Sequence, residues 1–312
     1  MVNLCRPTAP TALTERIDHH KMSHPIFSLH RRLSLLLAAC LLGLCAVPSW
    51  AAIDSELETQ IEKYVKSLRS KGVIRSDERT AWLAYDLTTG KKLASINEHT
   101  SLQAASMIKP YLALAFFHQV QNGKLVYGPT SKRHMELMIQ KSNNTSTNWV
   151  MRQTGGPSAT LALLKRHYPS LSQKISLVEY IPTNGRTYRN RGSASDYSRF
   201  LQALWKKQLP YSNEMLRLMA LPGNDRLYTK AKRVPTGTKV YNKTGSTAMC
   251  CGDMGILVAK GSNGRSYPYM LVGIIESSKR NTAYGTWITK RANIIREVSN
   301  LTFLAMKKRY PL

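Results

Sequence analysis

The order of strand-like and helix-like segments restricts the fold of this 312-residue chain more than any other feature. Residues 79–95 alternate apolar and polar side chains around Gly90, which predicts a β-hairpin. Strand patterns return at residues 238–242, 255–259 and 269–275, after a long stretch in which helical patterns dominate. Strands at both ends of the chain with helices between them predict an α+β domain.

Four segments carry the patterns of the helices that should surround this sheet. Residues 55–70 and 197–205 are typical of helices, and the second has an apolar stripe. The apolar run 111–117 predicts a buried helix, and Pro110 is tolerated in its first turn. A last amphipathic helix, expected to cover one sheet face, has apolar residues three and four positions apart: Trp287, Ile288, Ile294, Ile295, Val298, Leu301 and Leu304.

A serine and a lysine stand three residues apart at the expected start of the buried helix. On a helix Ser106 and Lys109 share one face, so the hydroxyl and the amine can come within hydrogen-bond reach. A desolvated lysine with a lowered pKa can accept the proton of a serine, which is a weak nucleophile at neutral pH. The helix N-terminus also offers N–H groups to an oxyanion. Taken alone, however, the pair also fits a capping serine and a surface lysine.

Two further motifs follow, Ser142–Asn144 and Lys243–Gly245. Each is weak alone, because three-residue motifs arise readily in a chain with 45 Lys and Arg residues. In this order the three motifs match the S-x-x-K, S-D-N and K-T-G signature of class A β-lactamases and penicillin-binding proteins. The chain therefore resembles the penicillin-recognising serine hydrolases over roughly residues 53–306, with Asn143 in place of an aspartate.

This resemblance implies roles for the residues of the first two motifs. Ser106 would be the nucleophile and Lys109 its base, while Ser142 would relay a proton to the leaving group. Asn144 would hold Lys109 and a substrate amide. Asn148, in the extended match Ser-Asn-Asn-Thr-Ser-Thr-Asn, would support the site structurally.

The third motif lies on an expected strand whose edge would face Ser106. By the resemblance, Lys243 and Thr244 would bind a substrate carboxylate, and Gly245 would belong to the same substrate-binding edge. The backbone N–H groups of Ser246 and Ser106 would form the oxyanion hole, which is worth about 3 kcal/mol per donor.

The resemblance also refines the fold. It implies three layers, α/β/α, around an antiparallel sheet of about five strands, with an all-helical lobe at roughly residues 106–235. Residues 52–312 would form this one domain, which is long enough to bury a sizeable core. Oligomeric state has no signature in the sequence.

One departure from the family concerns hydrolysis of the acyl-enzyme. Class A β-lactamases use a glutamate in an E-x-x-L-N loop, yet the only acidic residue between Asn144 and Asp196 is Glu179. Pro182 and Thr183 stand where leucine and asparagine are expected. Glu179 is thus either a deacylating group or a loop-stabilising charge. A positioned general base contributes about 100-fold to 10,000-fold, so its loss would leave a protein that β-lactams trap.

Three functions remain open from the sequence. A trimmed segment of 35 residues between Ser106 and Ser142 predicts an open cleft, which suits a cell-wall peptide as well as a β-lactam. The protein could therefore be a penicillin-binding peptidase that acts on D-Ala-type peptides, or a class A-type β-lactamase with a non-standard deacylating group. An exported pseudoenzyme that only binds peptidoglycan is the third, although such a binder has no need for both Ser106 and Lys109.

The N-terminal region predicts export. Arg31 and Arg32 precede the apolar segment 33–47, and Ser49–Ala51 fits a signal-peptidase site, so residues 1–51 should be a cleaved signal peptide. Met22 is an alternative start. Cys40 lies in a segment that resembles a lipoprotein box, but the apolar run continues beyond it, which favours ordinary cleavage over a lipid or membrane anchor. The expected location is the periplasm.

The net charge of +27 predicts attraction to polyanions. In an exported protein these would be anionic wall or membrane surfaces, and no nucleic-acid motif is present to favour DNA or RNA. No metal or other cofactor is expected, because His99, His118, His134 and His167 are dispersed without ligand spacing. Cys250 and its neighbour Cys251 are adjacent, which strains a disulfide between them, so two buried free thiols are expected.

Overall fold

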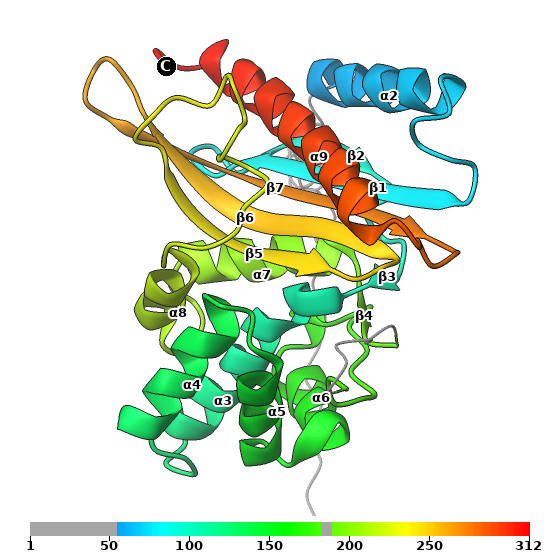
Figure 1. Cartoon of the computed structure of the whole chain (residues 1–312). Coiled ribbons are helices and arrows are strands. Elements are labelled where there is room, and N and C mark those ends of the chain that lie inside the picture. Colours follow the sequence, from blue (N-terminus) through cyan, green and yellow to red (C-terminus); the bar gives the residue numbers. More distant parts are fainter. Residues whose placement is uncertain (1–54, 183–188) are drawn as a thin grey trace, which may run out of the picture. The chain divides into compact units, whose positions relative to one another are not determined.

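In residues 55–182 and 189–312, which the computed structural model describes, the centre is a five-stranded antiparallel sheet (Figure 1). Its strands are β1 (Glu78–Asp86), β2 (Lys91–Ile96), β5 (Lys239–Ser246), β6 (Cys250–Lys260) and β7 (Ser266–Ser277). They lie in the order β2-β1-β7-β6-β5, so strands from both ends of the chain meet in one sheet. The predicted sheet and its hairpins are confirmed, and β5, which carries the third motif, is an edge strand.

Helices cover both faces of the sheet and build a lobe beneath it (Figure 1). The helices of the first layer are α2 (Ser55–Ser70) and α9 (Tyr284–Lys307), and α7 (Ala194–Trp205) packs on the opposite face against β7. The lobe contains α3 (Lys109–Gln121), α4 (Pro129–Ile139), α5 (Asn144–Gln153), α6 (Gly156–His167) and α8 (Ser212–Met219), with 3₁₀ turns at Ala105–Ile108 and Pro169–Leu171. It also holds a short strand pair, β3 (Leu102–Gln103) with β4 (Arg191–Gly192), which the helical patterns did not predict.

The sheet separates two hydrophobic cores, and β1 shows why. Ala81 and Leu83 face the core of the helical lobe, whereas Trp82 and Ala84 face the core under α2 and α9. Successive strand residues point to opposite faces, and both faces are covered, so nearly every position of β1 is buried. The apolar α3 runs through the lobe core, where Tyr111 to Phe117 are all buried.

The expected signal peptide at residues 1–51, with its alternative start at Met22, lies outside the described residues. Thr183 of the expected deacylation loop lies outside them too. Across the parts of the chain that are described, no helix combines the length and apolar character needed to cross a membrane.

We expect Gly273→Ala to destabilise the fold, because Gly273 of β7 is paired with Trp82 of β1 and the Trp82 ring packs against it. A Cβ atom at Gly273 would lie 2.7 Å from Trp82 Cζ3 and 3.4 Å from Ile295 Cγ2. Overpacking of this kind costs about 1–3 kcal/mol of unfolding free energy, measurable by urea denaturation. Gly285→Ala is the control, since its Cβ meets nothing within 4 Å and should change stability by no more than about 1 kcal/mol. Equal stabilities of the two variants would contradict the packing argument.

Candidate active site

Ser106 lies in the 3₁₀ turn that leads into α3, where the sequence predicted a helix N-terminus. Ala105 before it has a left-handed backbone, with φ of 43°, which is unusual for a residue with a side chain. The turn is fixed on both sides, because Ala104 N donates to Asn190 O at 2.9 Å and the buried Met107 side chain packs against the sheet. Ser106 itself is only partly buried, so its hydroxyl remains accessible.

The Ser142 hydroxyl connects the three motifs. Its Oγ donates to Ser106 Oγ at 2.8 Å and accepts from Lys109 Nζ at 3.0 Å and Lys243 Nζ at 3.1 Å. Ser142 adopts φ of 55°, the second left-handed non-glycine backbone at this site. Strain of this type is often stored at functional sites, and here it turns the hydroxyl between the two lysines. The structure therefore brings together the four side chains that the motifs singled out.

Lys109 is held by neutral oxygens. Its Nζ donates to Ser142 O at 2.6 Å and to Asn144 Oδ1 at 3.2 Å, in addition to Ser142 Oγ. The position of Asn144 beside Lys109 agrees with the expected contact. The sequence placed the Ser106 hydroxyl and the Lys109 amine where they can come within hydrogen-bond reach, and the hydrogen bonds of the structure connect the two groups through Ser142 Oγ.

Burial lowers the pKa of both lysines. Desolvation places the pKa of Lys109 well below its ordinary value, and the nearby Lys243 charge lowers it further. The pKa of Lys243 falls to about 8, mainly by burial, with Arg226 lowering and Asp253 raising it. Two ammonium groups on one hydroxyl repel each other, which favours loss of a proton from Lys109 beside a cationic Lys243. Once neutral, Lys109 keeps two N–H groups for Ser142 O and Asn144 Oδ1 and can accept from Ser142 Oγ. The arrangement supplies one proton acceptor and one cation.

The edge of β5 lies directly against the Ser106 turn. A Cβ atom at Gly245 would come within 3.2 Å of Ala104 O and Ala105 Cβ and 3.0 Å of Met107 Cγ, so a side chain here would be tightly packed and glycine favours the close approach. The close contact places the backbone that continues into Ser246 beside the Ser106 turn, where the sequence predicted the oxyanion hole. Thr244 is partly exposed next to Lys243 on the same strand.

A buried charge network braces β5 from behind, and sequence reasoning missed it. Arg226 donates from Nη2 to Ser246 Oγ at 2.6 Å and from Nη1 to Gly252 O at 2.7 Å. Asp253 accepts from Arg226 N at 2.6 Å and from Asn242 Nδ2 at 3.0 Å. Burial raises the pKa of Asp253 to about 6, and the Arg226 charge opposes this rise. No motif marks Arg226 in the sequence, because only the fold brings its loop behind β5.

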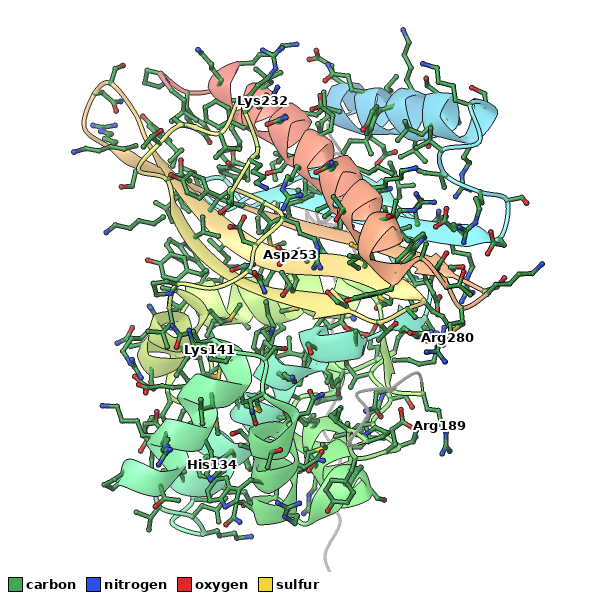
Figure 2. The ribbon with its side chains drawn as sticks, viewed as in Figure 1. His134, Lys141, Arg189, Lys232, Asp253 and Arg280 are labelled. Carbon is green, nitrogen blue, oxygen red and sulfur yellow. The ribbon has the colours of Figure 1, made fainter. Side chains whose placement is uncertain are left out.

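A recess of about 220 Å³ opens beside the Ser142 hydroxyl, and we call it the Lys141 recess. Ser142, Lys243 and Thr244 form its inner wall, while Leu218, Met219, Asn224 and Asn242 are among the other residues that line it. Lys141 is exposed at its rim. Figure 2 shows Lys141 at the top of the helical lobe and Asp253 within the sheet. None of the described residues that line this recess is acidic, so it suits an anionic group.

Glu179 lies in a segment pinned by two asparagines. Its Oε1 accepts from Arg189 N at 3.0 Å, and its backbone N–H and carbonyl bond the side chain of Asn190. Asn148 exchanges two hydrogen bonds with the Ile181 backbone, at 2.7 and 2.8 Å. The structural role expected for Asn148 agrees with this geometry. The bond from Arg189 N to Glu179 is compatible with a loop-stabilising charge, and the role of Glu179 in deacylation stays a prediction.

The remaining expectations concern thiols and metals. Cys250 and Cys251 are buried and free, as predicted, and burial raises the pKa of Cys251 to about 11. Cys250 Sγ donates to Gln103 O at 3.4 Å. Within residues 55–182 and 189–312, no group of three His, Cys, Asp or Glu side chains is arranged to hold a metal ion.

Comparison with known proteins places this site in a family. The sequence matches the β-lactamase enzyme family over residues 57–130 and 128–299, so the chain belongs to that family. The predicted superfamily, the serine β-lactamases and penicillin-binding proteins, is confirmed. No curated protein matches the sequence.

Solved structures establish the same fold. A leucine-to-glutamate mutant of PBP-A, an acyl-enzyme complex with penicillin G, has a TM-score of 0.66 at 19% identity and covers 83% of this chain and 98% of its own. PBP-A itself has a TM-score of 0.65 at 20% identity, covering 81% and 96%. The ancestral GNCA class A β-lactamase has a TM-score of 0.62 at 19% identity, covering 80% and 99%. The predicted fold class is therefore confirmed.

Asn148→Ala should destabilise the protein, because it leaves both Ile181 backbone groups without their partner. We expect a loss of about 1–2 kcal/mol of unfolding free energy, measured by denaturant titration. Asn122→Ala is the control, since Asn122 is exposed and bonds only His118 O, at 2.8 Å, through its side chain. Its substitution should change stability by less than about 0.5 kcal/mol. If Asn148→Ala also lowered the unfolding free energy by less than about 0.5 kcal/mol, the Ile181 segment would be held by other contacts.

Proposed function

We propose that this protein is an exported serine hydrolase that forms an acyl-Ser106 intermediate with β-lactams or with D-Ala-type cell-wall peptides and hydrolyses their amide bond. One observation carries the proposal. The Ser142 hydroxyl lies within 3.1 Å of a serine oxygen and two buried lysine amines. A protein that only bound peptidoglycan would gain nothing from a buried lysine with a lowered pKa that is hydrogen-bonded to a serine hydroxyl.

The geometry supports a two-step acyl transfer. Ser106 Oγ attacks the amide carbonyl while its proton passes through Ser142 Oγ to neutral Lys109. The tetrahedral oxyanion is stabilised by the backbone N–H groups of Ser106 and Ser246. The carbon–nitrogen bond then breaks, and the proton returns through Ser142 to the leaving nitrogen. Water hydrolyses the resulting ester, which releases the acid and restores Ser106.

The substrate carboxylate would lie on the leaving-group side, against Lys243 and Thr244. Lys243 is only 4% exposed, so water screens the positive charge of its protonated form only weakly. The Lys141 recess continues from this point and has room for the amino acid released from a peptide. We therefore favour a peptide whose leaving residue ends in a free carboxylate.

Slow hydrolysis of the acyl-enzyme is part of the proposal. Glu179 is engaged by the Arg189 backbone, and the sequence lacks the E-x-x-L-N pattern. The alternative, a class A-type β-lactamase with a non-standard deacylating group, requires Glu179 to activate water. The periplasm remains the proposed location, because residues 1–51 have the pattern of a cleaved signal peptide.

Penicillin G should acylate the exported form, residues 52–312, in a single burst that leaves a stable mass adduct. The physical reason is that no glutamate base replaces the lost E-x-x-L-N loop, which slows deacylation by about 100-fold or more. Intact mass and product release are followed together, with Ser106→Ala as the control that forms no adduct. Sustained turnover would favour the β-lactamase alternative, and Glu179→Gln would then identify the base. Absence of any adduct would refute the β-lactam proposal.

Acylation by penicillin G should weaken as the pH rises through about 8, the pKa of Lys243. The sign follows from burial, which lowers this pKa, so the cation that binds the carboxylate is present below about pH 8 and lost above it. The second-order acylation rate constant should fall about tenfold per pH unit on the alkaline side. Lys243→Arg should remove this decline, since guanidinium stays protonated. A decline that persists in Lys243→Arg would assign it to another group.

A further inference from the structure

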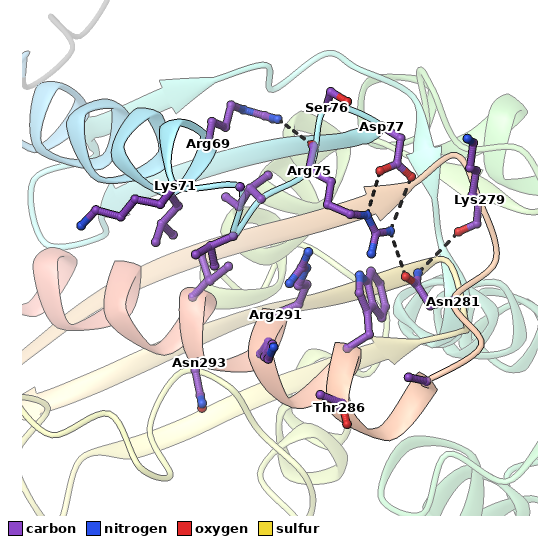
Figure 3. A pocket seen from close by; sticks show the side chains of 18 of the residues that line it. Arg69, Lys71, Arg75, Ser76, Asp77, Lys279, Asn281, Thr286, Arg291 and Asn293 are labelled. Atoms are coloured by element: carbon purple, nitrogen blue, oxygen red, sulfur yellow. Dashed lines mark hydrogen bonds and ion pairs between the residues drawn. The ribbon is translucent and has the colours of Figure 1, made fainter.

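A groove of about 1360 Å³ lies between the end of α2 and the start of α9, and we call it the α2–α9 groove (Figure 3). One wall is the turn after α2, and the other is the β7–α9 loop with the first turns of α9. Both helices cover the face of the sheet opposite to the helical lobe (Figure 1). The groove is therefore separate from the site at Ser106, and the catalytic steps described above do not use it.

The groove is strongly basic. Its lining includes one acidic residue, Asp77, and seven basic ones: Arg69, Lys71, Arg75, Lys279, Arg280, Lys290 and Arg291. Asp77 is neutralised by Arg75 Nε at 2.9 Å, and the buried Glu78 beneath the groove is neutralised by Arg291. When these two ion pairs are counted as neutral, the lining of the groove still carries a large excess of positive charge.

Four of these cationic side chains have no hydrogen bond or ion pair in the described part of the chain. They are Lys71, Lys279, Arg280 and Lys290, all exposed. Figure 3 shows Lys71 and Lys279 at opposite ends of the groove, so the free charges extend along its length. A ligand that meets all of them must be extended and carry several negative groups.

The floor of the groove is apolar. Leu68, Ile74, Trp287 and Ile294 line it, and Val73 at its edge is 39% exposed. A bare phosphate polymer has nothing to place against these side chains. A membrane surface is flat, whereas this site is concave. An extended peptide offers both carboxylates for the walls and small apolar side chains for the floor.

We propose that the α2–α9 groove is an exosite that binds an extended acidic peptide in which carboxylates alternate with small apolar residues. A peptide bound in the groove would hold the protein on a polymer that carries such peptides. Ser106 would meanwhile act on another part of the same polymer. The proposal rests on the groove alone and not on acyl transfer. The two can therefore fail separately.

The test is binding of a peptide of alternating alanine and glutamate, carrying an uncharged fluorophore, measured by anisotropy at low salt. The groove variant combines Lys71→Gln, Lys279→Gln, Arg280→Gln and Lys290→Gln. The control combines Lys124→Gln, Arg133→Gln, Lys174→Gln and Lys206→Gln, which removes the same charges from exposed residues of the helical lobe. We expect the dissociation constant to rise about tenfold or more in the groove variant and much less in the control. Val73→Ser should also weaken binding.

Each other outcome would overturn the proposal. Equal weakening in both variants would mean that net charge, and not the groove, attracts the peptide. Tighter groove-dependent binding of polyphosphate, or of vesicles that contain phosphatidylglycerol, would assign the groove to a different ligand class. If the peptide does not bind at low salt, the exosite proposal is refuted. The groove variant should unfold at the same urea concentration as the wild type, which shows that the variant is folded whether or not Ser106 is acylated.

Discussion

Two lysine amines converge on one serine hydroxyl, and the rest of the site depends on this contact. Lys109 and Lys243 are nearly inaccessible to water, and their Nζ atoms donate hydrogen bonds to neutral oxygens. Burying two cations without a bonded carboxylate is unfavourable unless one gives up its proton. Crowding and desolvation thus lower the pKa of Lys109 well below its ordinary value, which is what the acyl transfer proposed for Ser106 requires of this lysine.

The sheet edge must be held firmly for this contact to persist. Gly245 presses against the Ser106 turn, and Arg226 binds the opposite side of β5 through Ser246 Oγ and Gly252 O. Asp253, raised in pKa by burial, completes the network through Arg226 and Asn242. An edge strand lacks a neighbour on one side, so these side-chain bonds supply rigidity that a further strand would otherwise give.

Charge is distributed differently on the two sides of the sheet. At the active site the basic groups are buried, few and close together, which suits proton transfer and recognition of one carboxylate. In the α2–α9 groove they are exposed and spread along its length, which suits a longer ligand. The net charge of +27 by itself indicated only attraction to polyanions. The division of this charge between the buried site at Ser106 and a surface groove is a property of the fold.

The sequence alone determined the α+β class, the positions of the five sheet strands and of four helices, and the grouping of Ser106, Lys109, Ser142 and Lys243. These follow from local periodicity and short motifs, which neighbouring residues encode. Tertiary structure decided that Ser142 bridges Ser106 and Lys109, that Arg226 braces β5, and that a basic groove forms beside α9. Each of these depends on contacts between segments far apart in the chain, with distances and burial that no local pattern specifies.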